Sequence, residues 1–375
     1  MPPAPAAAAN RSLRKLLVVV LVLLVVGALV YRSLEGFSWA RLGQALREAR
    51  LSLILLSVAA VYAGYALRAL RWVRLSRYLG GAGFSSVFRS TVIGFTMIFL
   101  LGRAGEPIRP ILIARKDRLP ISSMFGIYAM ERVFDTAATA VLAGLSLFLF
   151  PDMLSSGGAN AAWIAPARTT GVVLLAGLLA AIMFLVYFRF HGAEAVNRRM
   201  AAWRTRAGWR ARLAMIFGGF FEGLQAIRTV SDLLAAVAYS AAHWAVIACI
   251  CLWVAHAFGG KLGALSFPGA MLVLAFTMVG STLQLPVVGG GSQAASLFAF
   301  TRILGVEQEP ALAASIVLWL VTFAACSVVG VPLLIHEGWS MGELRRLARA
   351  EAVAKAAGTH VDAGGAPAKS GESSR

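Results

Sequence analysis

Six ionisable side chains lie close together within an otherwise apolar part of the chain. They are Arg103, Glu106, Arg109, Glu131, Arg132 and Asp135. A charge at the centre of a bilayer costs roughly 2.5–3.5 kcal/mol on insertion scales, so these groups need partners or a ligand. Arginine offers a planar, always-charged fork that suits phosphate, and a carboxylate can neutralise it when no ligand is bound. The chemistry expected here is recognition of an anionic head group inside a membrane.

The backbone that carries the first three of these charges is expected to be irregular. Gly102 and Gly105 have no Cβ, so their backbone can adopt φ and ψ angles that other residues avoid, and Pro107 and Pro110 have no backbone N–H to donate. Pro107 is suited to begin a half-helix, whose free N–H groups attract an anion. Transporters often build a binding site from such broken helices.

The other three charges lie on the next predicted helix. Glu131 and Asp135 are four residues apart and therefore share one face, while Arg132 can pair with Asp135. Adjacent residues point about a hundred degrees apart, so we expect Arg132 rather than Glu131 to face the lipid head group. Asp135 is expected to take up a proton, because burial disfavours a charged carboxylate.

A second interrupted stretch follows Pro286. Gly289, Gly290 and Gly291 allow close backbone approach, and uncharged hydrogen-bonding groups flank them at Gln284, Ser292 and Gln293. The triplet matches no Walker pattern. Both stretches together are interpreted as a substrate site, and the alternative is a structural salt-bridge network that locks two hairpins.

Composition places these residues in a membrane. The chain has 375 residues, is 59% hydrophobic and carries a formal charge of +18, and apolar runs of about 20 residues recur. The fold class predicted is an all-α polytopic membrane protein. Basic residues flank the apolar runs, as membrane topology requires, so no nucleic-acid partner is expected. Neither a cofactor nor a metal is expected.

The chain is predicted to contain three regions. Residues 1–12 are a disordered N-terminus, residues 13–340 a transmembrane domain and residues 341–375 a mostly disordered tail. Six full spans are expected, at residues 16–30, 51–70, 121–150, 171–188, 233–258 and 311–335. Two re-entrant hairpins are expected at residues 84–114 and 268–304. Arg68, Arg71, Arg74 and Arg77 are interpreted as a cytoplasmic anchor, with a lipid phosphate site as the alternative.

Charge decides between a full crossing and a hairpin at residues 84–114. The hairpin places 27 basic residues on the side that holds both termini and seven on the other, whereas a full crossing puts the basic loop 189–228 outside. The positive-inside rule therefore favours the hairpin, with both termini cytoplasmic in a cell (inner) membrane. The halves 51–150 and 231–336 then form an inverted repeat, each with a break in its middle element.

Three motifs resemble a known family. The segments G-R-A-G-E-P-I-R, M-E-R-V-F-D and L-P-V-V-G-G-G are similar to the transmembrane domain of lysylphosphatidylglycerol synthase/flippase proteins, over roughly residues 13–335. The resemblance implies that a lipid with a polar head group moves between leaflets. It places the polar centre of the family on Gly102, Gly105, Glu106, Arg109, Glu131, Arg132 and Asp135. Because no soluble synthase domain follows, lipid synthesis is not expected.

Three functions compete at this point. The first is a flippase for an anionic or polar-headed lipid, such as a phospholipid, an aminoacyl-lipid or a polyprenyl-linked lipid. The second is a membrane enzyme, against which no metal or Ser/His/Asp set is found; His243 and His256 are interpreted as packed side chains. The third is an accessory subunit of a glycolipid or hopanoid pathway. The expected partner is a membrane lipid, together with a second copy of the chain or a lipid-biosynthesis protein.

Overall fold

The computed structural model describes residues 38–149, 226–285, 287 and 289–338, with Thr169, Val172 and Ala176. The span expected at 16–30, the span expected at 171–188 apart from Val172 and Ala176, the basic loop up to residue 225, Pro286 and the C-terminal tail lie outside the described residues. Within them the chain is almost entirely helical. Four helical stretches are long and apolar enough to cross a membrane: Leu51–Leu79, Phe84–Gly105, Val230–Ala257 and Gln308–His336.

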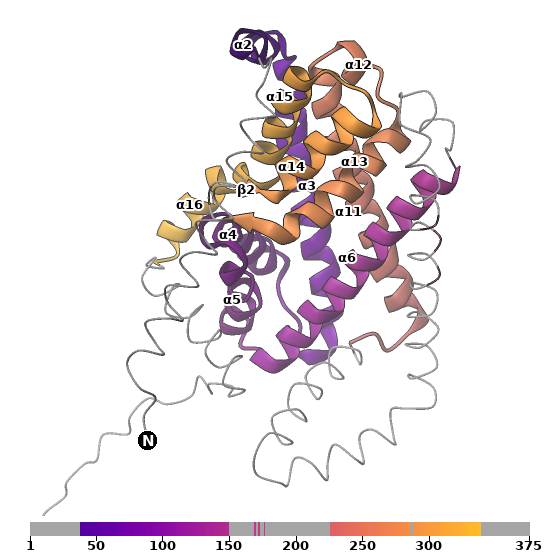
Figure 1. Cartoon of the computed structure of the whole chain (residues 1–375). Coiled ribbons are helices and arrows are strands. Elements are labelled where there is room, and N and C mark those ends of the chain that lie inside the picture. Colours follow the sequence, from indigo (N-terminus) through magenta and orange to yellow (C-terminus); the bar gives the residue numbers. More distant parts are fainter. Residues whose placement is uncertain are drawn as a thin grey trace, which may run out of the picture.

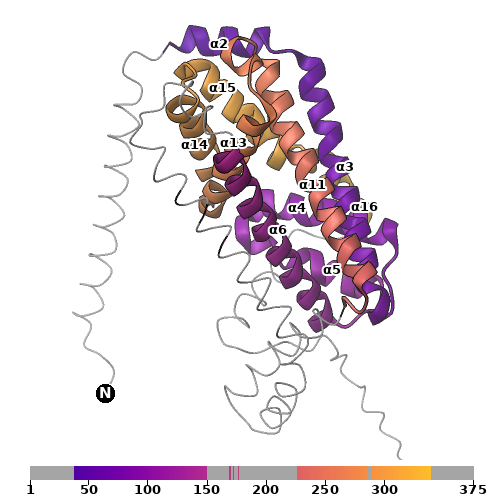
Figure 2. The same ribbon diagram turned by 90° about the vertical axis from the view of Figure 1, so that its right-hand side faces the viewer.

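The first half of the described chain begins with a short surface helix and ends with a long one. Its helices are α2 (Trp39–Glu48), α3 (Leu51–Ser76), α4 (Phe84–Leu101), α5 (Ile108–Lys116) and α6 (Ile121–Leu149). Two 3-10 turns interrupt them, η1 (Arg77–Leu79) and η2 (Gly102–Gly105). α2 has no buried residue and lies across one end of the bundle (Figure 2).

The second half of the described chain begins with a long helix that packs against α3. Its helices are α11 (Val230–Ala257), α12 (Gly260–Gly263), α13 (Phe267–Gly280), α14 (Gly291–Phe298), α15 (Gln308–Trp319) and α16 (Cys326–His336). Shorter elements join them: η4 (Ser281–Leu283), β1 (Gln284–Leu285), β2 (Gly289–Gly290) and the π-helical segments η5 (Ala299–Ile303) and η6 (Leu320–Ala324). Local signals begin two of these helices: Thr229 and Asp232 form a capping box on α11, and Ser266 caps α13.

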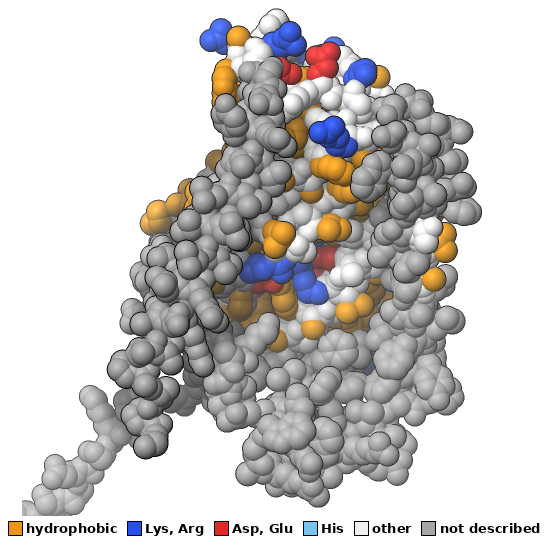
Figure 3. All heavy atoms as spheres, viewed as in Figure 1, with side chains coloured by type: hydrophobic (Ala, Val, Ile, Leu, Met, Phe, Trp, Pro, Cys, Tyr) orange, Lys and Arg blue, Asp and Glu red, His pale blue; other side chains and the backbone are white. Residues whose placement is uncertain are grey.

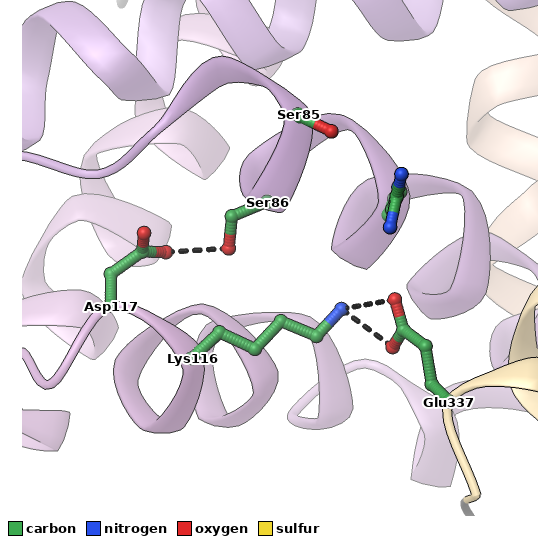
Figure 4. Close-up of a pocket in the computed structure, with 6 residues that line it drawn as sticks. Ser85, Ser86, Lys116, Asp117 and Glu337 are labelled. Carbon is green, nitrogen blue, oxygen red and sulfur yellow. Dashed lines mark hydrogen bonds and ion pairs between the residues drawn. The ribbon is translucent and has the colours of Figure 1, made fainter.

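α4 and α5 form the first helical hairpin. The chain reverses at η2, where a Cβ on Gly105 would overlap the Met97 carbonyl, so only glycine fits. Asp117 closes the base of the hairpin: it accepts from the Gly83 amide at 3.2 Å and from the Ser86 hydroxyl at 2.7 Å (Figure 4). The break expected at residues 102–110 is therefore present.

α13 and α14 form the second hairpin. Its tip is the antiparallel pair β1–β2, and its helices approach so closely that a Cβ on Gly291 would overlap the Gly280 carbonyl. Gly289 and Gly290 have positive φ angles of 83° and 113°, which glycine adopts without a steric cost. Backbone conformation therefore accounts for Gly289 and Gly290, and close helix packing accounts for Gly291.

The two hairpins open toward opposite ends of the bundle and meet at their tips. The base of the first lies beside the end of α16, where Lys116 pairs with Glu337 at 2.5 Å. The base of the second lies at the other end, near α2 and α12 (Figure 1). At the tips, the Val287 amide donates to the Phe99 carbonyl at 2.8 Å. The structure thus brings the two predicted breaks together.

The candidate functional site

Glu131 on α6 is the centre of a buried charge cluster. It is 0% exposed and accepts from Arg68 Nη1 at 2.5 Å, from Arg71 Nη2 at 2.7 Å and from Trp72 Nε1 at 2.9 Å. Both Nη atoms of Arg109, on α5, also donate to this carboxylate. One carboxylate therefore holds α3, α5 and α6 together.

Asp135 lies one turn further along α6, as the four-residue spacing predicted. Arg68 donates to it at 2.9 Å, Arg132 at 3.1 Å and Arg71 at 3.5 Å. Three guanidinium groups around one carboxylate favour its charged form. The expectation that Asp135 takes up a proton is therefore wrong for this arrangement: the opposite charges offset the burial that prompted it.

Arg68 and Arg71 do not lie where the sequence pattern predicted. They were interpreted as part of a cytoplasmic anchor, but they are 6% and 1% exposed and face the α6 carboxylates. Their other donors reach α11, where Arg68 Nε donates to His243 at 2.9 Å and Arg71 Nη1 to Ser240 at 2.6 Å. The spacing of three residues puts all four arginines on one stripe, and only the lower pair, Arg74 and Arg77, lies near the end of α3, where both pair with Asp232.

The outer part of the cluster is open. The side chain of Arg132 is 43% exposed, and Glu106 accepts from the Tyr128 hydroxyl at 2.6 Å. A cavity of only about 10 Å³, room for about one water molecule, lies between them and is lined by Gly94, Phe95, Ile98, Glu106, Arg109, Tyr128 and Arg132. In Figure 3 basic and acidic side chains lie together at mid-height of this face, with hydrophobic side chains above and below. Arg132 is thus the more open member of the Glu131–Arg132 pair, as expected.

Aromatic rings surround the buried arginines. The Arg109 guanidinium lies 4.8 Å from the Trp72 ring centroid and 5.7 Å from those of Phe95 and Tyr128. Phe95 also lies 5.4 Å from the Arg68 guanidinium. Cation–π contacts of this kind stabilise a desolvated cation by roughly 2 kcal/mol. Arg109, which was expected to bind substrate, instead has its Nη donors on Glu131 and its faces on rings.

Arg103 and the glycine-rich tip form a junction between the hairpins rather than part of the cluster. Arg103 is 59% exposed; its Nε donates to the Thr282 carbonyl at 3.1 Å, and Glu106 lies 3.9 Å away. On the second hairpin, Gln284 pairs with Gly290 in the β1–β2 ladder, and Gln293 accepts from the Gly290 amide. Gln284 and Gln293, expected to bind substrate, thus take part in the hydrogen bonding of the tip.

A larger open pocket of about 490 Å³ lies at the base of the first hairpin (Figure 4). Its acids already have partners in the protein: Asp117 accepts from Ser86, and Glu337 pairs with Lys116. Arg89 lines it as well. Because Lys116 and Arg89 balance the charges of Asp117 and Glu337, this pocket attracts an anion less than the buried cluster does.

The buried cluster and its open edge have an excess of positive charge. Arg68, Arg71, Arg109 and Arg132 contact two carboxylates, those of Glu131 and Asp135, while Glu106 at the edge is offset by Arg103 of the hairpin junction. Glu131 lies about 15 Å from the first residue of α6. Within the described ranges, no group of three or more His, Cys, Asp or Glu residues is arranged to hold a metal ion.

The fold and this cluster define a multi-pass α-helical membrane protein with a buried charge cluster among α3, α5, α6 and α11. The family model described as the lysylphosphatidylglycerol synthase TM region matches residues 16–330, and the chain belongs to this family. Membership of this family indicates a function related to membrane lipids. A comparison with curated proteins finds no match.

Proposed function

We propose that this protein moves a lipid with an anionic head group between membrane leaflets, without changing it covalently. The observation that carries the proposal is the excess of two positive charges in the cluster and at its edge. A network that served only to lock helices together is expected to be neutral, because unpaired charge in a membrane is costly. An incoming phosphate is the partner that this excess requires.

The cluster divides into two parts with different roles. Arg71 and Arg109 are buried and engaged with Glu131, so they fix the helices and set the local potential. Arg68, which also bonds His243, is the buried arginine that turns toward the head group in our proposal. Arg132, whose side chain is 43% exposed, contacts the head group in our proposal, beside Tyr128 and Glu106. The lipid tails then remain in the bilayer while the head group crosses at the hairpin tips.

We further propose that α4–α5 and α13–α14 are re-entrant, and that the hairpin base near Asp117 faces the cytoplasm. With Arg68, Arg71, Arg103 and Arg109 left out, because they lie in the cluster or at the hairpin tips, 23 basic residues against seven support this orientation. The membrane is then the inner membrane, with both termini cytoplasmic. Cysteine labelling of residue 118 and of residue 261 from either side of the membrane tests the orientation.

Purified protein in liposomes tests the function. A labelled phosphatidylglycerol that changes leaflet without chemical change supports the proposal. A chemically altered lipid indicates a membrane enzyme instead. If the folded protein neither moves nor alters any of several labelled lipids, an accessory subunit is indicated.

A further inference from the structure

His243 on α11 is bonded at both ring nitrogens. It is 3% exposed; its Nε2 lies 2.9 Å from Arg68 Nε, and its Nδ1 lies 3.2 Å from the Gly64 carbonyl oxygen. An arginine N–H can only donate, so Nε2 must be the acceptor. The proton of the neutral ring is then on Nδ1, which donates to Gly64. The missing side chain of Gly64 lets the ring reach this carbonyl, since a Cβ there would lie 3.2 Å from Nδ1.

The charged groups that face His243 come from two other helices. α3 contributes Arg68 and Arg71, and α6 contributes Glu131 and Asp135, with Arg132 paired to Asp135. The arginines stay protonated, and each carboxylate is held ionised by several guanidinium groups. Histidine is the side chain whose ordinary charge change falls between pH 5 and 8. His243 is therefore the member of this cluster suited to gain and lose a proton.

A proton on Nε2 and the present position of Arg68 exclude each other. The protonated ring would set its own N–H against the Nε–H of Arg68, and two positive charges would face each other at hydrogen-bond distance. If Arg68 moves toward an anion, the lone pair on Nε2 becomes free to accept a proton from water. The ring then carries one positive charge, and Nδ1 still donates to Gly64.

We propose that His243 takes up a proton when Arg68 turns toward an anionic head group, so that binding and protonation are coupled. This inference rests on the proposed function and names its proton-linked residue, in place of Asp135. Coupling is reciprocal: if the bound state holds one more proton, lower pH favours binding. Affinity then rises by up to about tenfold for each pH unit of acidification, between the pKa values of His243 in the two states.

Binding of dihexanoyl-phosphatidylglycerol to the full chain in detergent, measured by calorimetry from pH 5.5 to 8, tests the coupling. The phosphodiester of this probe keeps one negative charge across this pH range, so any dependence of its affinity on pH comes from the protein. His243→Gln keeps an oxygen that accepts from Arg68 and an amide that donates to Gly64, but it cannot titrate. His256→Gln is the matched control, because His256 lies near the other end of α11, bonded to the Leu265 carbonyl at 2.8 Å.

The expected result is tighter binding in acid for wild type and for His256→Gln, and a flat profile for His243→Gln. Nitrogen-15 NMR of histidine-labelled protein gives a second readout: an Nδ1–H tautomer without lipid and a doubly protonated ring with lipid. Binding that is equally strong at every pH, or a ring that stays neutral with lipid bound, overturns the coupling and leaves the proposed function standing. If wild type binds no lipid while it is folded, the proposed function fails and the coupling fails with it.

Discussion

Replacement of Arg132 by glutamine separates a head-group site from a structural network. Arg132 is 43% exposed and pairs with Asp135, which keeps Arg68 and Arg71 when Arg132 is lost. A partly exposed pair contributes about 0–1 kcal/mol, so the free energy of unfolding should change little. A hydrogen bond to a charged group contributes about 1.5–3 kcal/mol. We therefore expect lipid affinity to fall by about 10- to 150-fold in Arg132→Gln.

Glu131→Gln provides the contrast. Its carboxylate is the acceptor for three arginines and one tryptophan, and the substitution leaves those guanidinium groups without their counter-charge. Loss of one partner of a buried ion pair costs about 3–5 kcal/mol, a large part of the stability of a typical domain. We expect Glu131→Gln to yield little folded protein, whereas Arg132→Gln yields normal amounts.

The assay measures abundance and transport on the same preparations. Size-exclusion chromatography and thermal unfolding in detergent report folding, and dithionite quenching of labelled phosphatidylglycerol in proteoliposomes reports transport. Arg302→Gln, in the π-helical end of the second hairpin, controls for the loss of one positive charge. Wild-type transport by Arg132→Gln at normal abundance refutes the head-group role. Equal loss of folded protein in Arg132→Gln and Glu131→Gln favours the structural network.

Two single substitutions and one cysteine pair test the hairpins. Gly291→Ala places a methyl group on the Gly280 carbonyl, so we expect the second hairpin to separate and the melting temperature to fall by several degrees; an unchanged melting temperature contradicts the close packing. Asp117→Ala removes two hydrogen bonds at the base of the first hairpin and should cost about 1 kcal/mol in thermal unfolding, as loss of a helix cap does. Cysteines at Phe99 and Val287 should form a disulfide on oxidation, visible as a mobility shift after cleavage between them; failure to crosslink contradicts contact between the tips.

Local patterns in the sequence predicted much of the site. The glycine and proline positions predicted both breaks, since their backbone preferences act within a few residues. The spacing of Glu131 and Asp135 predicted a shared face, and the structure places both against α3. The charge pattern predicted hairpins that enter the membrane from opposite sides. In the structure the base of the first lies beside Lys116 and Glu337 and that of the second near α2 and α12, and their re-entrant insertion stays a prediction.

The partners of those carboxylates were missed because they come from distant helices. Arg68 lies 63 residues from Glu131, and His243 lies 175 residues from Arg68. Arginines near the end of an apolar run have the same sequence pattern whether their side chains reach the membrane surface or face the interior of the protein. One signal was available: α3 runs 26 residues, about 39 Å, and Arg68 lies about 26 Å along it, within the thickness of a bilayer. An arginine at that depth requires a carboxylate, and α6 supplies two.

The first hairpin is attached to the rest of the bundle at three levels of unequal strength. Its base is held by Lys116 and Glu337, its middle by Arg109 on buried Glu131, and its tip by Arg103 and the Phe99–Val287 contact. The attachments at the base and the tip are only partly buried and contribute about 0–1 kcal/mol each, and the buried one costs about 3–5 kcal/mol to break. Of these three polar attachments, a rigid sliding motion breaks all, whereas a pivot about Arg109 keeps the buried one; α4 also packs against α16, where Thr96 donates to the Cys326 carbonyl at 3.1 Å. We therefore expect the hairpin to rock about its middle, so the Phe99–Val287 disulfide should stop transport; full transport by the oxidised protein would exclude this motion.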